Sequence, residues 1–116
     1  MIRKIECVSV FTRDLAASVA FYARLGLTEA WRIDRPNASL IGLKFPEAAS
    51  AELVLSNNAE VPVTEIELLC DDVRATRAEL ESTDGIVWIR EPFATESGHV
   101  AVMEAPDGNV FVLVGG

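Results

Sequence analysis

The sequence predicts an α+β fold in which one domain contains two similar βαβββ modules. The main observation is an internal repeat, because residues 10–27 resemble residues 68–85. Within the repeat Asp14 matches Asp72, so the two copies lie 58 residues apart, half of the 116-residue length. A repeat of this length indicates two copies of one structural unit. The total length suits a single domain with a sizeable core.

The first copy is predicted to contain a strand, a helix and three further strands. Residues 5–11 are rich in β-branched and aromatic side chains, which is typical of a strand. Asp14 provides an N-cap oxygen for a helix over residues 15–25, and Gly26 is suited to the left-handed conformation that ends a helix. The remaining strands are expected at residues 27–33, 40–45 and 52–55, with turns at 35–37 and 56–58.

The second copy repeats this order after a linker at residues 58–62. A strand is expected at 65–69, and Asp72 is the N-cap of a helix whose inner face holds Val73, Thr76 and Leu80. Strands follow at 86–89, 100–103 and 110–114, with a tight turn at 106–109. The modules therefore span about residues 1–57 and 63–116. We expect each to be a curved sheet covered by one helix, with an open cup between the concave faces.

Charge and composition exclude several classes of function. The chain carries 18 acidic and 10 basic residues, a formal net charge of −8, which is the wrong sign for neutralising nucleic-acid phosphates. No apolar segment reaches the length of a membrane span, and Glu6 interrupts the first apolar run too early for a signal peptide. We therefore expect a cytoplasmic protein with no nucleic-acid or membrane partner.

Two groups of residues resemble a known family. Asp14-Leu15, Phe21-Tyr22 and Leu25-Gly26-Leu27 are similar to the DL…FY…LG signature of the vicinal oxygen chelate superfamily. Residues 105–109, Ala-Pro-Asp-Gly-Asn, resemble its DPDGN turn with Ala105 in place of the first Asp. The superfamily includes glyoxalase I, extradiol dioxygenases, fosfomycin-modifying enzymes and bleomycin-resistance proteins. The resemblance covers essentially the whole chain and implies an open half-barrel with a concave cup.

The resemblance also implies where a metal would bind. The four ligand positions of the superfamily correspond to Cys7, Glu52, Glu65 and Val112. Valine has no donor atom, and a thiolate with two carboxylates is an unusual catalytic set. We therefore expect no metal cofactor. In the alternative, a divalent ion such as zinc, nickel or manganese is held by Cys7, Glu52 and Glu65.

Strand alternation, anchored on these positions, predicts the lining of the cup. Two tryptophans flank it and suit a planar or cationic ligand. Its carboxylates could be neutralised by a cationic ligand or by arginines such as Arg32, Arg35 or Arg90. The predicted ligand-binding residues are Cys7, Ser9, Phe11, Trp31, Glu52, Val54, Glu65, Glu67, Trp88 and Val112.

Three functions remain open from the sequence, and the third, after the two given next, is a regulatory or interaction module whose cup is closed by side chains. The first is a metal-independent protein of the bleomycin-resistance type, a homodimer that sequesters a planar or cationic small molecule and so confers antibiotic resistance. The alternative is a glyoxalase-like, metal-dependent lyase or isomerase in which Glu52 and Glu65 act as ligands, or one of them as a general base. No catalytic residue is assigned in the first hypothesis.

Overall fold

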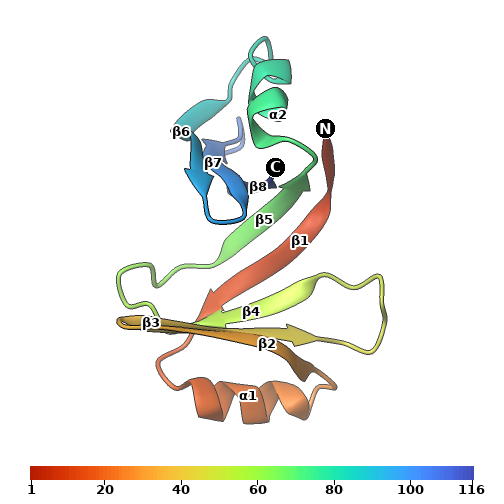
Figure 1. Ribbon diagram of the computed structural model, residues 1–116, viewed down its shortest axis with the longest axis vertical. Helices are drawn as coiled ribbons and strands as arrows, with labels where there is room; N and C mark the ends of the chain where they lie inside the picture. The colour runs from red at the N-terminus through yellow and green to blue at the C-terminus, as the bar shows by residue number, and fades with distance from the viewer. The chain divides into compact units, whose positions relative to one another are not determined.

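A computed structural model describes residues 1–116 of the protein, which divide into two compact units. Module 1 is Cys7–Thr64, and module 2 combines Met1–Glu6 with Glu65–Gly116. The first six residues were expected in the first copy but group with the second. Each module contains one helix and strands in the predicted βαβββ order, so the α+β class and the duplicated unit are confirmed (Figure 1).

Module 1 contains a four-stranded mixed sheet in the order β2-β3-β4-β1, with helix α1 against one face (Figure 1). Strand β1 pairs with β4 in parallel, whereas β2–β3 and β3–β4 are antiparallel. A turn at Pro36 and Asn37 separates β2 from β3, as predicted. The elements are β1 (Ile2–Phe11), α1 (Leu15–Ala23), β2 (Thr28–Arg35), β3 (Ala38–Lys44) and β4 (Glu52–Ser56).

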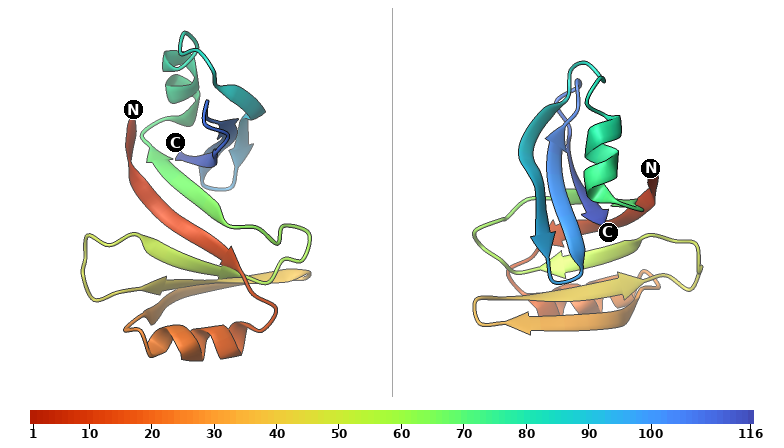
Figure 2. Two further views of the ribbon diagram at one scale, coloured as in Figure 1. Left: turned by 180° about the vertical axis from the view of Figure 1, so that it is seen from behind. Right: turned by 45° about the horizontal axis from the view of Figure 1, so that its top comes forward.

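Module 2 repeats this arrangement with the strand order β5-β8-β7-β6 (Figure 2). Strands β5 and β8 are parallel, and the β6–β7 and β7–β8 pairs are antiparallel. Strand β6 continues well beyond the predicted end at residue 89 because two register shifts let it follow β7. The elements are β5 (Glu65–Cys70), α2 (Val73–Glu79), β6 (Val87–Thr95), β7 (Gly98–Glu104) and β8 (Val110–Gly115).

Both helices begin at the predicted aspartates. Asp14 accepts a hydrogen bond from the backbone N–H of Ala17, and Asp72 accepts one from Ala75, each at 3.0 Å. These bonds satisfy N–H groups that the first turn of a helix leaves without partners. Gly26 has the predicted positive φ of 102°, although α1 itself ends at Ala23. Neither helix is long and apolar enough to span a membrane.

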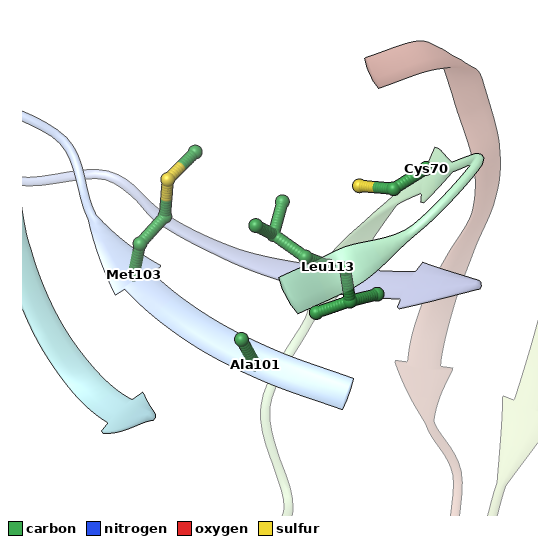
Figure 3. Close-up of a cluster of buried hydrophobic side chains, with 5 residues drawn as sticks. Cys70, Ala101, Met103 and Leu113 are labelled. Carbon is green, nitrogen blue, oxygen red and sulfur yellow. The ribbon is translucent and has the colours of Figure 1, made fainter. Parts of the chain in front are cut away.

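Each module has its own apolar core between sheet and helix. In module 1 the buried residues Leu27, Ile41, Leu43 and Leu55 pack beneath Leu15, Val19 and Tyr22 of α1. In module 2 the corresponding cluster is Cys70, Val73, Ala101, Met103 and Leu113 (Figure 3). The strand residues of each cluster come from one face of the sheet, and the residues that alternate with them lie on the opposite face.

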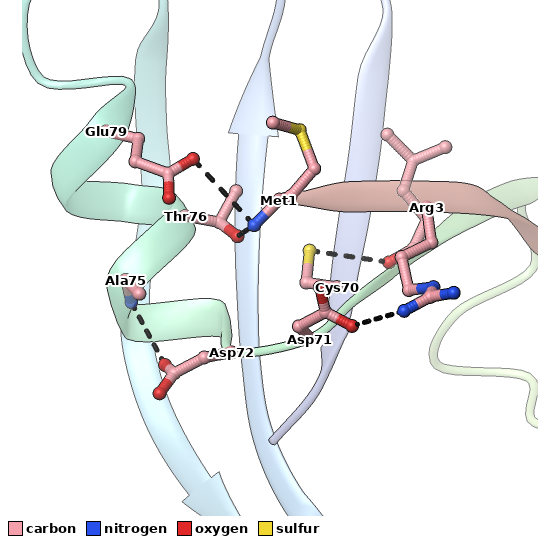
Figure 4. A network of polar contacts seen from close by, with 9 residues as sticks. Met1, Arg3, Cys70, Asp71, Asp72, Ala75, Thr76 and Glu79 are labelled. Atoms are coloured by element: carbon pink, nitrogen blue, oxygen red, sulfur yellow. Dashed lines mark hydrogen bonds and ion pairs between the residues drawn. The ribbon is translucent and has the colours of Figure 1, made fainter.

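Polar contacts attach the start of β1 to α2 within module 2 (Figure 4). The Met1 amino group donates to the Thr76 hydroxyl at 3.2 Å, and the Asp71 N–H donates to the Met1 carbonyl. Arg3 Nη1 lies 2.9 Å from Asp71 Oδ1. Ile2 adds an apolar contact to the core cluster. These contacts explain why residues 1–6 group with module 2.

Candidate functional site

The distal face of each sheet, which we define as the face opposite its helix, carries most of the predicted site residues. In module 1 the strand register places Trp31, Gly42, Val54 and Ser9 in one row across β2, β3, β4 and β1. Cys7 and Glu52 are partners in the next row. Since side chains alternate along a strand, these residues lie opposite the core residues Leu43 and Leu55.

Trp31 rests on the backbone of Gly42 at the distal face of module 1. A β-carbon at Gly42 would coincide with the indole ring, so only glycine leaves room for it. A register shift between Glu29 and Trp31 precedes this contact. Such an extra residue re-aims the side chains that follow it. The ring is also fixed at its edge, because Trp31 Nε1 donates to Glu52 Oε1 at 3.0 Å.

Glu52 has a donor for each carboxylate oxygen. Oε1 accepts from Trp31, and Oε2 lies 3.5 Å from Lys44 Nζ. The Glu52 side chain is 20% exposed, so this pair is partly shielded from water, whereas Lys44 is half exposed. Arg32, one of the arginines predicted to neutralise the carboxylates, pairs with Asp34 instead. Glu52 therefore orients Trp31 and balances Lys44.

The floor beside Trp31 is buried. Cys7, Ser9 and Val54 each have less than a tenth of their surface exposed. Phe11 lies further along β1, with the Arg13 guanidinium 5.9 Å from its ring centre.

The distal face of module 2 carries three of the predicted residues. The register aligns Glu67 of β5 with Val112 of β8, Val102 of β7 and Arg90 of β6. Alternation along β5 places Glu65 on the same face as Glu67. Glu104 joins them, because its partner Val110 alternates with Val112. Three carboxylates and one guanidinium therefore share this face with a row of valines.

Trp88 is not on the distal face of module 2, unlike the other predicted ligand-binding residues of this module. Its partner in the register is Met103, and both pack in the core cluster of module 2. The Arg77 guanidinium of α2 covers the ring at 4.4 Å from its centre. Arg77 is held by Glu91 and Glu81. Arg90 occupies in module 2 the position that Trp31 has in module 1. Each lies on the last strand of its row, β6 or β2, and each directly follows a register shift.

The register of the two modules also tests the expected metal ligands. Ser9 pairs with Val54, and Glu67 pairs with Val112. Glu67 lies 58 residues after Ser9, and Val112 lies 58 residues after Val54. Val54, not Glu52, is therefore the internal counterpart of Val112. Glu52 also has both oxygens engaged by Trp31 and Lys44. Of the four expected ligand positions, Val112 offers no donor atom, so only Cys7, Glu52 and Glu65 could contact a metal ion.

Two contributors to these faces, Gly42 and Lys44, were not predicted from the sequence, and Arg90 was predicted only as a possible partner of the carboxylates. Gly42 appears in the sequence as an isolated glycine in a strand, which is a signal for close approach of another group. The position of Lys44 on the distal face depends on the register of β3, and that of Arg90 depends on the bulges of β6. Neither the register nor the bulges can be predicted from the sequence alone. The structure brings Cys7, Ser9, Trp31, Glu52 and Val54, all predicted ligand-binding residues, to one face of module 1.

Comparison with known structures supports the fold over the full chain. A methylmalonyl-CoA epimerase variant from Streptomyces coelicolor, in complex with 2-nitronate-propionyl-CoA, has a TM-score of 0.74. It is 19% identical, and the match covers 99% of this chain and 98% of that chain. A hypothetical protein from Bacillus halodurans has a TM-score of 0.74 at 15% identity, covering 95% and 91%. An uncharacterized protein from Methanosarcina mazei reaches 0.65 at 19% identity, covering 97% and 94%.

At these identities the structural matches establish the fold and no particular activity. No curated protein matches the sequence significantly. The family comparison is more specific, because the sequence profile of one superfamily matches residues 4–113, nearly the entire chain. The chain belongs to the Glyoxalase/Bleomycin resistance protein/Dioxygenase superfamily.

Proposed function

We propose that this protein binds a planar, cationic small molecule on the distal faces of its modules and does so without a metal ion. The single observation that carries the proposal is the Trp31 indole, which rests on Gly42 and is fixed through its Nε1 by Glu52. An aromatic ring held in this way is a preorganised stacking surface, so little conformational entropy is lost when a ligand binds.

The charges of module 2 support a cationic ligand. Glu65, Glu67 and Glu104 share its distal face with one arginine, and the whole protein carries a formal charge of −8. A cation is attracted by these carboxylates and by the negative field of the protein. In module 1 the face of the Trp31 indole is, separately, a surface on which a cation can stack. Glu52 mainly positions Trp31 and adds little to the attraction of a cationic ligand, because Lys44 already balances the charge of its carboxylate.

The alternative function, a glyoxalase-like lyase or isomerase, needs Glu52 as a metal ligand or a general base. Both Glu52 oxygens already have donors in module 1. Cys7 and Glu65 would then be the only donors left from the four expected positions, because Val112 has none. No observation favours this alternative over binding. Homodimer formation, a cytoplasmic location and a role in antibiotic resistance stay predictions from the sequence.

Two single-tryptophan variants test the proposal, since the protein has only two tryptophans. In Trp88→Phe the sole reporter is Trp31, and in Trp31→Phe it is Trp88. The probe is N-methylquinolinium, a planar cation, and quinoline is its uncharged match at neutral pH. We expect N-methylquinolinium to quench Trp31 fluorescence saturably and quinoline to bind about tenfold more weakly, a difference of about 1.4 kcal/mol.

The Trp31→Phe protein is the matched control, because Trp88 lies in the core under Arg77. Its fluorescence should respond to neither probe in a saturable manner. Saturable quenching of Trp88 fluorescence without quenching of Trp31 fluorescence would show that the ligand does not bind beside Trp31. Equal affinity for the cation and for quinoline would contradict the charge preference.

A further inference from the structure

Arg90 is an exposed cation in module 2. It occupies the row position that Trp31 holds in module 1. Its guanidinium carbon lies 4.3 Å from the ring centre of Phe93. The guanidinium groups of Arg77 and Arg3, by comparison, lie in ion pairs with carboxylates. Stacking on Phe93 covers one face of the guanidinium and leaves its N–H groups available to an acceptor.

The backbone around Arg90 is shaped to place this side chain on the distal face. Register shifts occur on both sides of it, between Trp88 and Arg90 and between Arg90 and Phe93. Because of the first shift, Trp88 points to the core while Arg90, two residues later, points to the other face. Bulges of this kind occur next to binding sites, where they re-aim a side chain.

The same face has opposite charges at its two ends. Arg90 stands on β6, and Glu67 stands in the same row on β5, with Val102 and Val112 between them. Three strand spacings of about 4.8 Å separate their backbones by about 14 Å. Val100 and Val114, in the row of Phe93, extend the apolar floor, and all four valines are partly exposed. A ligand lying across the strands would meet a cation, then an apolar floor, then carboxylates.

We propose that this face of module 2 binds a zwitterion whose carboxylate pairs with Arg90 and whose cationic group lies toward Glu65. The inference rests on the proposed function, which it deepens by adding an acid group to the cationic ligand. A guanidinium binds a carboxylate through two parallel N–H···O bonds. A simple anion is repelled by Glu65, Glu67 and Glu104, and a simple cation is repelled by Arg90. A zwitterion with an apolar body gains at both ends.

Three planar probes with matched bodies separate these cases at neutral pH. They are 4-(aminomethyl)benzoate, a zwitterion, 4-methylbenzylamine, a cation, and 4-methylbenzoate, an anion. Isothermal titration calorimetry on the full chain measures binding of each. We expect the zwitterion to bind at least about tenfold more tightly than either singly charged probe. Arg90→Gln should remove this advantage and leave the affinity for 4-methylbenzylamine unchanged or higher.

Two further variants control the experiment. Arg90→Lys keeps the charge but not the bidentate geometry, so it should keep part of the preference. Arg74→Gln removes the same charge from α2, on the helix side of the module, and should change nothing. Zwitterion binding that is no tighter than cation binding, or that survives Arg90→Gln, would overturn the inference. That result would leave the proposed function standing if N-methylquinolinium still quenches Trp31, whereas loss of both effects would end both.

Discussion

The packing of Trp31 on Gly42 is the residue-scale feature on which the proposed binding surface depends. Glycine is a poor strand former, because it loses more conformational entropy than other residues and packs no side chain. Its presence at the centre of β3 is explained by the indole, which occupies the space of the missing side chain. The hydrogen bond from Trp31 Nε1 to Glu52 then sets the direction in which the ring points.

Substitution Gly42→Ala tests this packing. The added methyl group collides with the indole, so we expect a loss of about 1–3 kcal/mol in the free energy of unfolding, as for other overpacked sites. The measurement is urea denaturation followed by circular dichroism. The same substitution made in a Trp31→Ala background should have a much smaller effect, since the ring is no longer there. Equal losses in both backgrounds would show that Gly42 is needed for another reason.

At the scale of single elements, the helices were predicted well because their signals are local. Asp14 and Asp72 each lie directly before an apolar segment, and each caps its helix through an N–H three residues ahead. The strands were predicted in type and order, but the course of β6 was not. Its two bulges decide that Trp88 is in the core and Arg90 on the distal face. A bulge depends on pairing with β7, which the sequence of β6 alone does not reveal.

The N-cap of α2 makes a prediction about pH. The hydrogen bond from the Ala75 N–H holds the pKa of Asp72 below its usual value of 3.8. A carboxyl with a lowered pKa in the folded state stabilises the fold above its unfolded pKa, and this stabilisation is lost as the pH falls through the folded value. Asn also caps helices but does not titrate. As the pH falls below 3.8, the free energy of unfolding of the native protein should therefore decrease relative to that of Asp72→Asn.

Urea denaturation of both proteins at neutral pH and in acid measures this shift. The difference between the proteins is the relevant quantity, because many other carboxyl groups titrate in the same range. An Asp107→Asn variant, at the turn before β8, is a second case, since the Asn109 N–H lowers the pKa of Asp107 in the same way. A difference that stays constant from neutral pH into acid would contradict the assigned cap.

For the whole molecule, the repeat was the most informative part of the sequence. It predicted two βαβββ modules, and it also predicted which positions of β1 and β5 are equivalent. The register adds that Val54 is the internal counterpart of Val112 and lies two residues from Glu52 on the same face of β4. Alternation alone does not give the row in which a residue lies, so the positions of Lys44 and Arg90 depend on the register.

The central claim is that ligand binding on these faces needs no metal ion. The most direct measurement is the dissociation constant of N-methylquinolinium for the Trp88→Phe protein, by Trp31 quenching, in three samples. One contains EDTA, one has no addition, and one contains zinc, nickel or manganese in turn. We predict the same constant in all samples. Binding that is lost in EDTA and restored by one of the metals would contradict the claim.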